Sequence, residues 1–341
     1  MFPEWTWVVG FYIGAAIGSF LNVVIYRMPR GLSLSNPKHS FCPNCKHKLD
    51  VLDLFPLVSW VLLGGKCRHC KAKVAARYFV VELLTGGIWG GIWWLYLVKS
   101  AQPAQAIALS LFASALVAAI FIDLAFFIIP DQVNAWMLLC GVGLNVWTLV
   151  QHDTGSMLWG MPSSVAGWLV GTGIIWSITL LGRVAFGKDA MGHGDIKMAR
   201  GIGAVLLPIG AALSIAMAVG LGAVLGIFQA IWLNRMRKKH PEPEQETEDD
   251  EPYVPESIGS ILWCGIGYFL CIDAIGLLFP KLYVWWFKED PYAVESVDDE
   301  FEIEPTMIPF GPYLAAGALI VVLLHEHLFA WVAAYFAWTG I

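Results

Sequence analysis

"WTWVVGFYIGAAIGSFLNVVIY", residues 5–26, is an apolar run of 22 residues. A helix of that length crosses the ~30 Å hydrocarbon core of a membrane. Glu4 rather than a basic segment precedes the run, which is also too long for the apolar core of a cleavable signal peptide. Residues 1–27 are therefore predicted to form a first transmembrane helix.

The composition of the whole chain agrees with a membrane location. Of its 341 residues, 57% are hydrophobic and only 14% are charged, and the mean hydropathy is +0.64. These values lie outside the range of soluble domains. We predict an all-α polytopic membrane protein with about eight transmembrane helices. After the first, the apolar segments lie at 78–98, 104–129, 134–150, 162–186, 196–213, 214–233 and 307–324.

The positive charges indicate how the chain is oriented. Ten of the 21 Lys and Arg residues fall within 27–77, and four more cluster within 235–239. Because short loops rich in Lys and Arg stay in the cytoplasm, both segments are predicted to be cytoplasmic. Counting spans from an outside N-terminus then places Asp123 near the cytoplasmic end of the third span and Asp195 at the cytoplasmic start of the sixth.

Two Cys-x-x-Cys motifs lie in the basic loop, "CPNCKHK" (42–48) and "CRHCKAK" (67–73), with 21 residues between them. Four thiolates close a tetrahedral shell around zinc and leave no position for a substrate, which is typical of a structural site. The alternative, a pair of disulfides, is disfavoured in the cytoplasm. Residues 28–77 are therefore predicted to be a cytoplasmic zinc-binding loop with the ligands Cys42, Cys45, Cys67 and Cys70.

Two aspartates are the candidate catalytic residues. Asp123 lies inside an apolar span, in "FIDLAFFIIPD" (121–131), where a carboxylate is costly and functional by default. Asp195 lies in "MGHGDIKMARG" (191–201), and its alternative role is that of a helix N-cap. Aspartyl hydrolysis needs two carboxylates that share one proton, of which one activates water and the other donates to the carbonyl oxygen. A membrane core over 78–235 is predicted to carry this pair.

The residues around Asp195 and after Asp123 allow two interpretations. Gly192 and Gly194 let the backbone come close to a substrate strand, although glycine before a helix is also ordinary punctuation. Asp131 is either a helix N-cap or a third acid of the same pocket. His193 is interpreted as an exposed loop residue.

Six ordered motifs resemble those of the bacterial type IV prepilin peptidases, which are aspartyl proteases of the Gly-x-Gly-Asp type. The motifs are "GSFLNVVIYRMPRG" (18–31), the paired cysteine motifs with "LFPLVSWVLLGGKC" (54–67), "ARYFVVELLTG" (76–86), "FIDLAFFIIPD", "GHGDIKMARGIGA" (192–204) and "IPFGPYLA" (308–315).

The resemblance implies that Asp123 and Asp195 are the catalytic pair. It implies a multi-pass protein of the bacterial inner membrane, with the lipid bilayer and prepilins or pseudopilins as partners, and no nucleic acid. The basic leader of the substrate would be cut after a glycine at the cytoplasmic face. Many members then methylate the new N-terminus with S-adenosylmethionine.

Glu82 lies about one turn inside the second span, where a carboxylate is functional by default. It is expected to line the substrate or methyl-donor pocket, or else to pair with Arg77 or Lys73.

One segment departs from the resemblance. Residues 236–306 are longer than expected and place an apolar stretch (257–279) between acidic stretches at 240–256 and 280–305. The first acidic stretch is predicted to be disordered. A single crossing at 257–279 would put the last transmembrane helix and aromatic tail, 307–341, in the wrong orientation. A hairpin or re-entrant excursion with "LYVWWF" (282–287) as its second limb is therefore favoured, in which Asp273 pairs with a cation or lines water.

Two other functions use the same residues. A presenilin-like protease would cut within a transmembrane helix, and an ion-coupled transporter would relay ions through Asp123, Asp195 and Glu82. The position of the cut distinguishes the first from a leader peptidase, and ion flux in a variant unable to cleave identifies the second.

Overall fold

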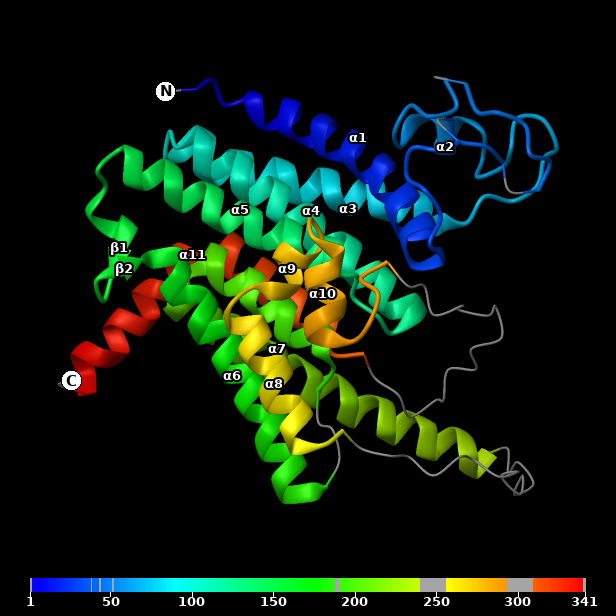
Figure 1. Ribbon diagram of the computed structural model, residues 1–341. Coiled ribbons are helices and arrows are strands. Elements are labelled where there is room, and N and C mark those ends of the chain that lie inside the picture. The colour runs from blue at the N-terminus through cyan, green and yellow to red at the C-terminus, as the bar shows by residue number, and fades with distance from the viewer. Residues whose placement is uncertain are drawn as a thin grey trace, which may run out of the picture.

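The computed structural model describes residues 2–37, 39–42, 44–50, 52–187, 191–239, 256–292 and 309–339. Nearly all of its regular structure is helical (Figure 1). Within these ranges, seven helices are long and apolar enough to cross a membrane. The prediction of an all-α polytopic membrane protein is thus confirmed.

The helices and strands follow one another in the order of the predicted segments. The long helices are α1 (Thr6–Arg27), α3 (Ala76–Ile92) with the π-helical η2 (Trp93–Lys99), α4 (Pro103–Phe126), α5 (Asp131–Val150), α6 (Ser163–Phe186), α7 (His193–Lys239) and α11 (Gly311–Thr339). The short elements are η1 (Met28–Arg30), α2 (Val58–Leu62), η3 (Thr154–Ser156), the strand pair β1 (Met157–Leu158) and β2 (Met161–Pro162), α8 (Ile258–Phe269), α9 (Ile272–Gly276) and α10 (Pro280–Phe287).

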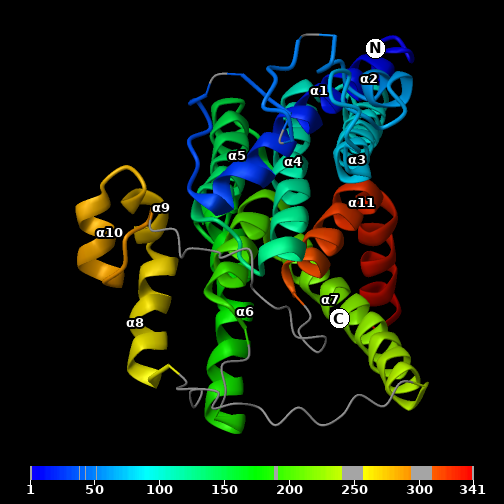
Figure 2. The ribbon, with the colours of Figure 1, turned by 90° about the vertical axis from the view of Figure 1, so that its right-hand side faces the viewer.

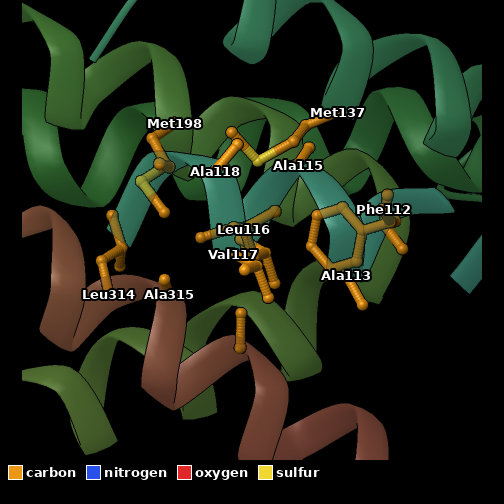
Figure 3. Packing of buried hydrophobic residues seen from close by; sticks show 14 of the residues in the cluster. Phe112, Ala113, Ala115, Leu116, Val117, Ala118, Met137, Met198, Leu314 and Ala315 are labelled. Carbon is orange, nitrogen blue, oxygen red and sulfur yellow. The ribbon is translucent and has the colours of Figure 1, made fainter. Parts of the chain in front are cut away.

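Helix α4 lies in the middle of the bundle. In its most apolar stretch 67% of the residues are buried, the largest share among the seven spans. Residues 112–119 of α4 are mostly small or aliphatic, which lets neighbouring helices approach closely. Figure 3 shows Met137 of α5, Met198 of α7 and Leu314 of α11 gathered around this stretch. The other helices of the core are thus positioned against α4.

Helices α6 and α7 cross with their backbones in contact. A Cβ atom added at Gly167 would overlap the carbonyl of Gly203, and one added at Gly203 would overlap the carbonyl of Gly167. One turn along α6, a Cβ atom at Gly171 would overlap the carbonyl of Ala199. Small residues at a crossing are a common means of close helix packing in membranes. This crossing holds the first half of α7, which carries Asp195, against α6.

Helix α7 differs from the sequence prediction. Two spans are predicted at 196–213 and 214–233, whereas the structure has one helix with a kink. Leu207 adopts φ 61° and ψ 175° directly before Pro208, whose ring is incompatible with an ordinary helical turn. Because the helix resumes after Pro208 without a loop, the described part of the chain has seven candidate spans rather than eight.

Helices α8, α9 and α10 form a hairpin, which we call the insert hairpin (257–287; yellow and orange in Figure 2). With 12 residues, α8 is too short to cross a membrane. Trp263 of α8 stacks on Trp286 of α10 with ring centroids 4.3 Å apart, and each indole N–H donates to the backbone carbonyl of the other residue. The two limbs therefore lie side by side. Of the acidic stretches 240–256 and 280–305, residues 240–255, predicted to be disordered, and 293–305 lie outside the described residues.

The close backbone contact between α6 and α7 can be tested by a substitution that adds one methyl group at the crossing. We expect Gly167→Ala to destabilise the protein by about 1–3 kcal/mol, because overpacking a tight contact costs that much. Gly143→Ala on α5 is the matched control, since open space surrounds Gly143 and alanine is the better helix former. Thermal unfolding in detergent should give a lower midpoint for Gly167→Ala alone, and equal midpoints would contradict the close contact.

Candidate active site and metal centre

Asp123 lies in the last turn of α4 and is 5% exposed. The chain leaves the helix at Phe127, which has φ 55° and whose N–H donates to the carbonyl of Asp123. The Asp123 carboxylate accepts a hydrogen bond from the backbone N–H of Gly311, the first residue of α11. Unpaired N–H groups at a helix start attract a carboxylate. A Cβ atom at Gly311 would overlap this carboxylate, so any other residue there would displace the Asp123 side chain.

Asp195 lies in the first turn of α7, where the preceding glycines determine its surroundings. It is not the N-cap, because α7 begins at His193. Its carboxylate accepts a hydrogen bond from the backbone N–H of Gly192. A Cβ atom at Gly194 would lie only 3.3 Å from the Cβ of Ile129, in the turn that follows Asp123. Gly194 therefore lets the start of α7 come close to the end of α4.

The structure brings the two predicted catalytic residues together. Asp123 is a charged neighbour that acts electrostatically on Asp195. Two carboxylates within each other's electrostatic reach disfavour the doubly ionised state, because their negative charges repel. The pair is assembled from the end of α4, the start of α7 and the start of α11, three segments that are distant in the sequence. This arrangement can hold one proton between two acids and place a water molecule against them.

Asp131 has different partners. It is the first residue of α5, and its carboxylate accepts hydrogen bonds from the Lys197 ammonium (2.6 Å) and from the Tyr283 hydroxyl (2.7 Å). The Lys197 side chain is 9% exposed and that of Asp131 is 13% exposed. The structure thus places Asp131 in a largely buried ion pair between α5 and α7.

Glu82 fastens the cysteine-containing loop to α3. Its carboxylate accepts a hydrogen bond from the backbone N–H of Leu57 (2.7 Å) and another from the hydroxyl of Ser19 on α1. Leu57 has φ 62°, a conformation that a leucine rarely adopts without outside support. These contacts give Glu82 a structural task, and neither of the cations considered from the sequence, Arg77 or Lys73, forms one of them.

The four cysteines of the loop form one cluster. All are free thiols, and their sulfur atoms lie within 4.8 Å of one another. Sulfur atoms in a tetrahedral zinc site with 2.3 Å bonds are about 3.8 Å apart, and Cys42 Sγ lies 3.8 Å from Cys70 Sγ. Each motif is closed by an antiparallel bridge, Phe41 with Lys48 and Lys66 with Lys73. The donor set and its spacing fit a metal ion.

Hydrogen bonds distribute the protons of this cluster unevenly. The backbone N–H of Ala72 and the amide of Asn44 lower the pKa of the Cys70 thiol to about 6. At Cys45 the backbone N–H of His47 also lowers the pKa, but desolvation and the three neighbouring thiols outweigh it and raise the pKa to about 11. A metal cation that binds all four sulfur atoms displaces the protons that remain.

Comparisons with known proteins agree with this geometry. The model of the bacterial peptidase A24 N-terminal domain matches residues 12–96, and that of the type IV leader peptidase family matches 110–227. A Myxococcus xanthus (strain DK1622) protein named prepilin leader peptidase/N-methyltransferase is 31% identical over 316 residues, which cover 92% of this chain and 89% of that protein. The chain belongs to the type IV leader peptidase family.

Other members of the type IV leader peptidase family are similar over shorter stretches. Proteins of the same name from Aeromonas hydrophila (32% identical; 67% of this chain and 82% of that protein) and Stutzerimonas stutzeri (33%; 63% and 78%) match this chain. No solved structure matches it. The family membership and the seven apolar helices identify a multi-pass enzyme of the inner membrane. The insert hairpin and α11 lie outside the residues that the two family models match.

Several residues near the site were not predicted from the sequence. Lys197 and Arg200 could have been identified from the sequence, because a charged residue inside an apolar span is functional by default. Tyr283 could not have been identified in this way, since its partner Asp131 is 152 residues away in the sequence. The role of the Gly311 N–H could not be predicted either. The sequence at the end of α4 does not indicate that the start of α11 packs against it.

An experiment can distinguish the structural role of Glu82, which is to hold the loop through the Leu57 N–H, from a role in a ligand pocket. We expect Glu82→Leu to loosen the loop over 28–75, because the partly buried N–H of Leu57 loses its acceptor at a cost of about 1 kcal/mol. In Glu82→Gln the amide oxygen still accepts this hydrogen bond. Limited proteolysis in detergent should therefore cut the loop faster in the Leu variant only. Equal rates in both variants would show that the hydrogen bond does not hold the loop.

Proposed function

We propose that this protein is a membrane aspartyl endopeptidase with Asp123 and Asp195 as its catalytic residues. The observation that carries the proposal is the pairing of these two acids from α4 and α7 beside the N–H of Gly311. Membership of a peptidase family supports the same reaction class.

In the proposed mechanism the acid pair holds one proton between its carboxyl groups. The ionised aspartate takes a proton from a water molecule, whose oxygen attacks the carbonyl carbon of the scissile peptide. The protonated aspartate donates its proton to the carbonyl oxygen. Collapse of the tetrahedral intermediate breaks the C–N bond: the pair gives its proton to the leaving amine and takes one proton back from a hydroxyl group of the intermediate. The water is thereby divided between the new carboxyl and amino termini, and the pair returns to its starting state.

The proposed substrates are prepilins, which the relatives' name states for them, or pseudopilins. The cut would follow a glycine at the cytoplasmic membrane face and remove a basic leader. The charge distribution supports this side of the membrane, because the loop richest in Lys and Arg, residues 27–77, adjoins the Asp123-bearing end of α4, where Arg30 lies 4.9 Å from the centre of the Phe126 ring. An acid pair within one turn of a helix end is about 5 Å from that end, which suits a bond at the membrane boundary.

We further propose that the chain methylates the new N-terminus with S-adenosylmethionine, as the relatives' name states for them. S-adenosylmethionine would supply an electrophilic methyl group to the freed amine. The cysteine cluster would hold zinc through four thiolates, and such a closed site orders the loop without taking part in the reaction.

Replacing either acid tests the peptidase. Asp123→Asn and Asp195→Asn should each lower cleavage of a cognate prepilin by at least about 10³-fold, because the two acids act as a unit. Asp153→Asn is the matched control, since Asp153 is an exposed residue that caps the turn at η3. Mass spectrometry of the substrate, with and without S-adenosylmethionine, measures leader loss and methyl gain in the same sample.

Each other outcome of that experiment points to a specific alternative. Full cleavage by either Asn variant would exclude the aspartyl mechanism. A cut within the apolar helix of the substrate would instead indicate a presenilin-like protease. Cleavage without a mass gain when S-adenosylmethionine is present would remove the proposed methyl transfer and leave the peptidase.

Metal analysis tests the cysteine site. The purified protein should contain about one zinc ion per chain, because four thiolates form one tetrahedral site. The double variant Cys42→Ser, Cys45→Ser should lose the metal, whereas Cys140→Ser, in the apolar α5, should keep it. An unchanged zinc content in the double variant would reject the four-cysteine site.

A further inference from the structure

The insert hairpin is joined to α6 along the length of α8. Three side chains of α6 donate hydrogen bonds to backbone carbonyls at successive levels: Trp168 to Phe269, Trp176 to Ile261 and Arg183 to Glu256. Because residue numbers rise along α6 as they fall along α8, the two helices are antiparallel. The hairpin is therefore attached along one face of the helix that crosses α7.

A row of basic side chains on the first two turns of α7 contacts the same hairpin. His193, Lys197 and Arg200 are spaced by four and three residues, so they share one face of the helix. The two ring nitrogens of His193 lie 2.9 Å from the Tyr268 hydroxyl and 2.9 Å from a Glu256 carboxylate oxygen. His193 is thus held by the hairpin, which corrects its interpretation as an exposed loop residue.

Arg200 forms the deepest of these contacts. Its two terminal nitrogens donate to the two carboxylate oxygens of Asp273, each over 2.6 Å, and one of them also donates to the carbonyl of Tyr268 (3.0 Å). Arg200 is 0% exposed and Asp273 is 1% exposed. Of the two roles considered for Asp273, the structure shows pairing with a cation. Because breaking a buried bidentate pair is costly, the pair favours the alignment of α7 and α9 that keeps it intact.

Lys197 joins three elements at one point. Its ammonium binds Asp131 of α5, while the Tyr283 hydroxyl of α10 binds the other oxygen of the same carboxylate. The aromatic rings of Tyr268, Tyr283 and Phe287 lie 5.3–5.9 Å from the ammonium. These rings provide a favourable, water-poor setting for the charge. The hairpin thereby contacts both α7 and the turn that follows Asp123.

We propose that the insert hairpin is a clamp that positions Asp195 opposite Asp123. Asp195 belongs to the same two turns of α7 as Lys197 and Arg200, but spacings of two and five residues direct it away from their face. Gly192 and Gly194 on its N-terminal side have no side chains with which to anchor it. Beyond the glycine crossing with α6, the angle of this helix start therefore depends on what holds the opposite face, which is the hairpin together with Asp131.

The clamp assigns a role to residues outside the matched family regions. Tyr283, Asp273 and Tyr268 act on the acid pair through Lys197 and Arg200, so they are positioning residues and not catalytic ones. The proposal rests on the acid pair being the peptidase centre. Its physical basis is that a misplacement of about 1 Å between reacting groups costs up to about 10²-fold in rate.

Removal of one hydroxyl group tests the clamp. Tyr283→Phe keeps the ring but removes the hydrogen bond to Asp131. Tyr292→Phe is the matched control, because Tyr292 follows the insert hairpin, its hydroxyl donates to the Leu277 carbonyl of the hairpin (2.6 Å), and the residue is 52% exposed. We expect Tyr283→Phe to lower kcat for a prepilin about tenfold with KM unchanged. The backbone amides of 197–201 should also exchange hydrogen faster in Tyr283→Phe, measured by mass spectrometry on the full-length protein in detergent.

The two readouts separate positioning from a loss of folded protein. A general loss of stability would speed exchange throughout the bundle, whereas a loosened clamp speeds it at the start of α7. Equal kcat in the two Phe variants would overturn the proposal, as would a lower kcat with unchanged exchange at 197–201. A second variant, Arg200→Met with Asp273→Leu, replaces the ion pair by apolar side chains of similar size and should show the same local change.

The experiment also distinguishes this proposal from the function on which it rests. If the wild-type protein fails to cleave a confirmed substrate, the proposed peptidase is wrong. If the wild-type protein cleaves and the Tyr283→Phe and Tyr292→Phe variants behave alike, the peptidase stands and the clamp is wrong.

Discussion

A carboxylate inside an apolar helix bundle must have hydrogen-bond donors beside it, and this requirement organises the structure. The Asp123 carboxylate is bound by the first N–H of α11, and that of Asp195 by the N–H of Gly192. Backbone N–H donors add no side-chain volume to the site, and unlike side-chain donors they cannot rotate into another rotamer. Three glycines make the arrangement possible, because Gly192 and Gly311 present their N–H groups and Gly194 lets α7 approach the turn after α4. The bundle can therefore be compact around two acids.

The same chain buries two further charged pairs, Arg200 with Asp273 and Lys197 with Asp131. Such pairs add little net stability, because the cost of removing charges from water offsets their attraction. Loss of one partner is nevertheless expensive, about 3–5 kcal/mol, since it leaves an unpaired buried charge. Any alignment of the helices that separates one of these pairs is therefore disfavoured. The glycine crossing of α6 and α7 has the same effect, because only small residues fit there.

The sequence predicted much of this molecule because its strongest signals are local. Apolar length alone identified the membrane helices, and the spacing of the cysteines anticipated a cluster whose sulfur atoms lie within 4.8 Å. The prediction of two separate spans was wrong at α7. Pro208 indicates that the helix is interrupted, but not whether it resumes beyond the interruption. The partners of Glu82, Asp131 and Arg200 could not be predicted either. Each lies on a different element, and helix periodicity does not reveal which elements meet.

The contact between Asp123 and Gly311 also has a consequence for biosynthesis. Ribosomes make the chain from its N-terminus, so α4 enters the membrane long before α11 has been translated. During that interval the Asp123 carboxylate lacks the donor that it has in the finished protein. The acid pair is therefore complete only after the final described helix has docked, and a nascent or truncated chain inserted in the membrane holds an unfinished site.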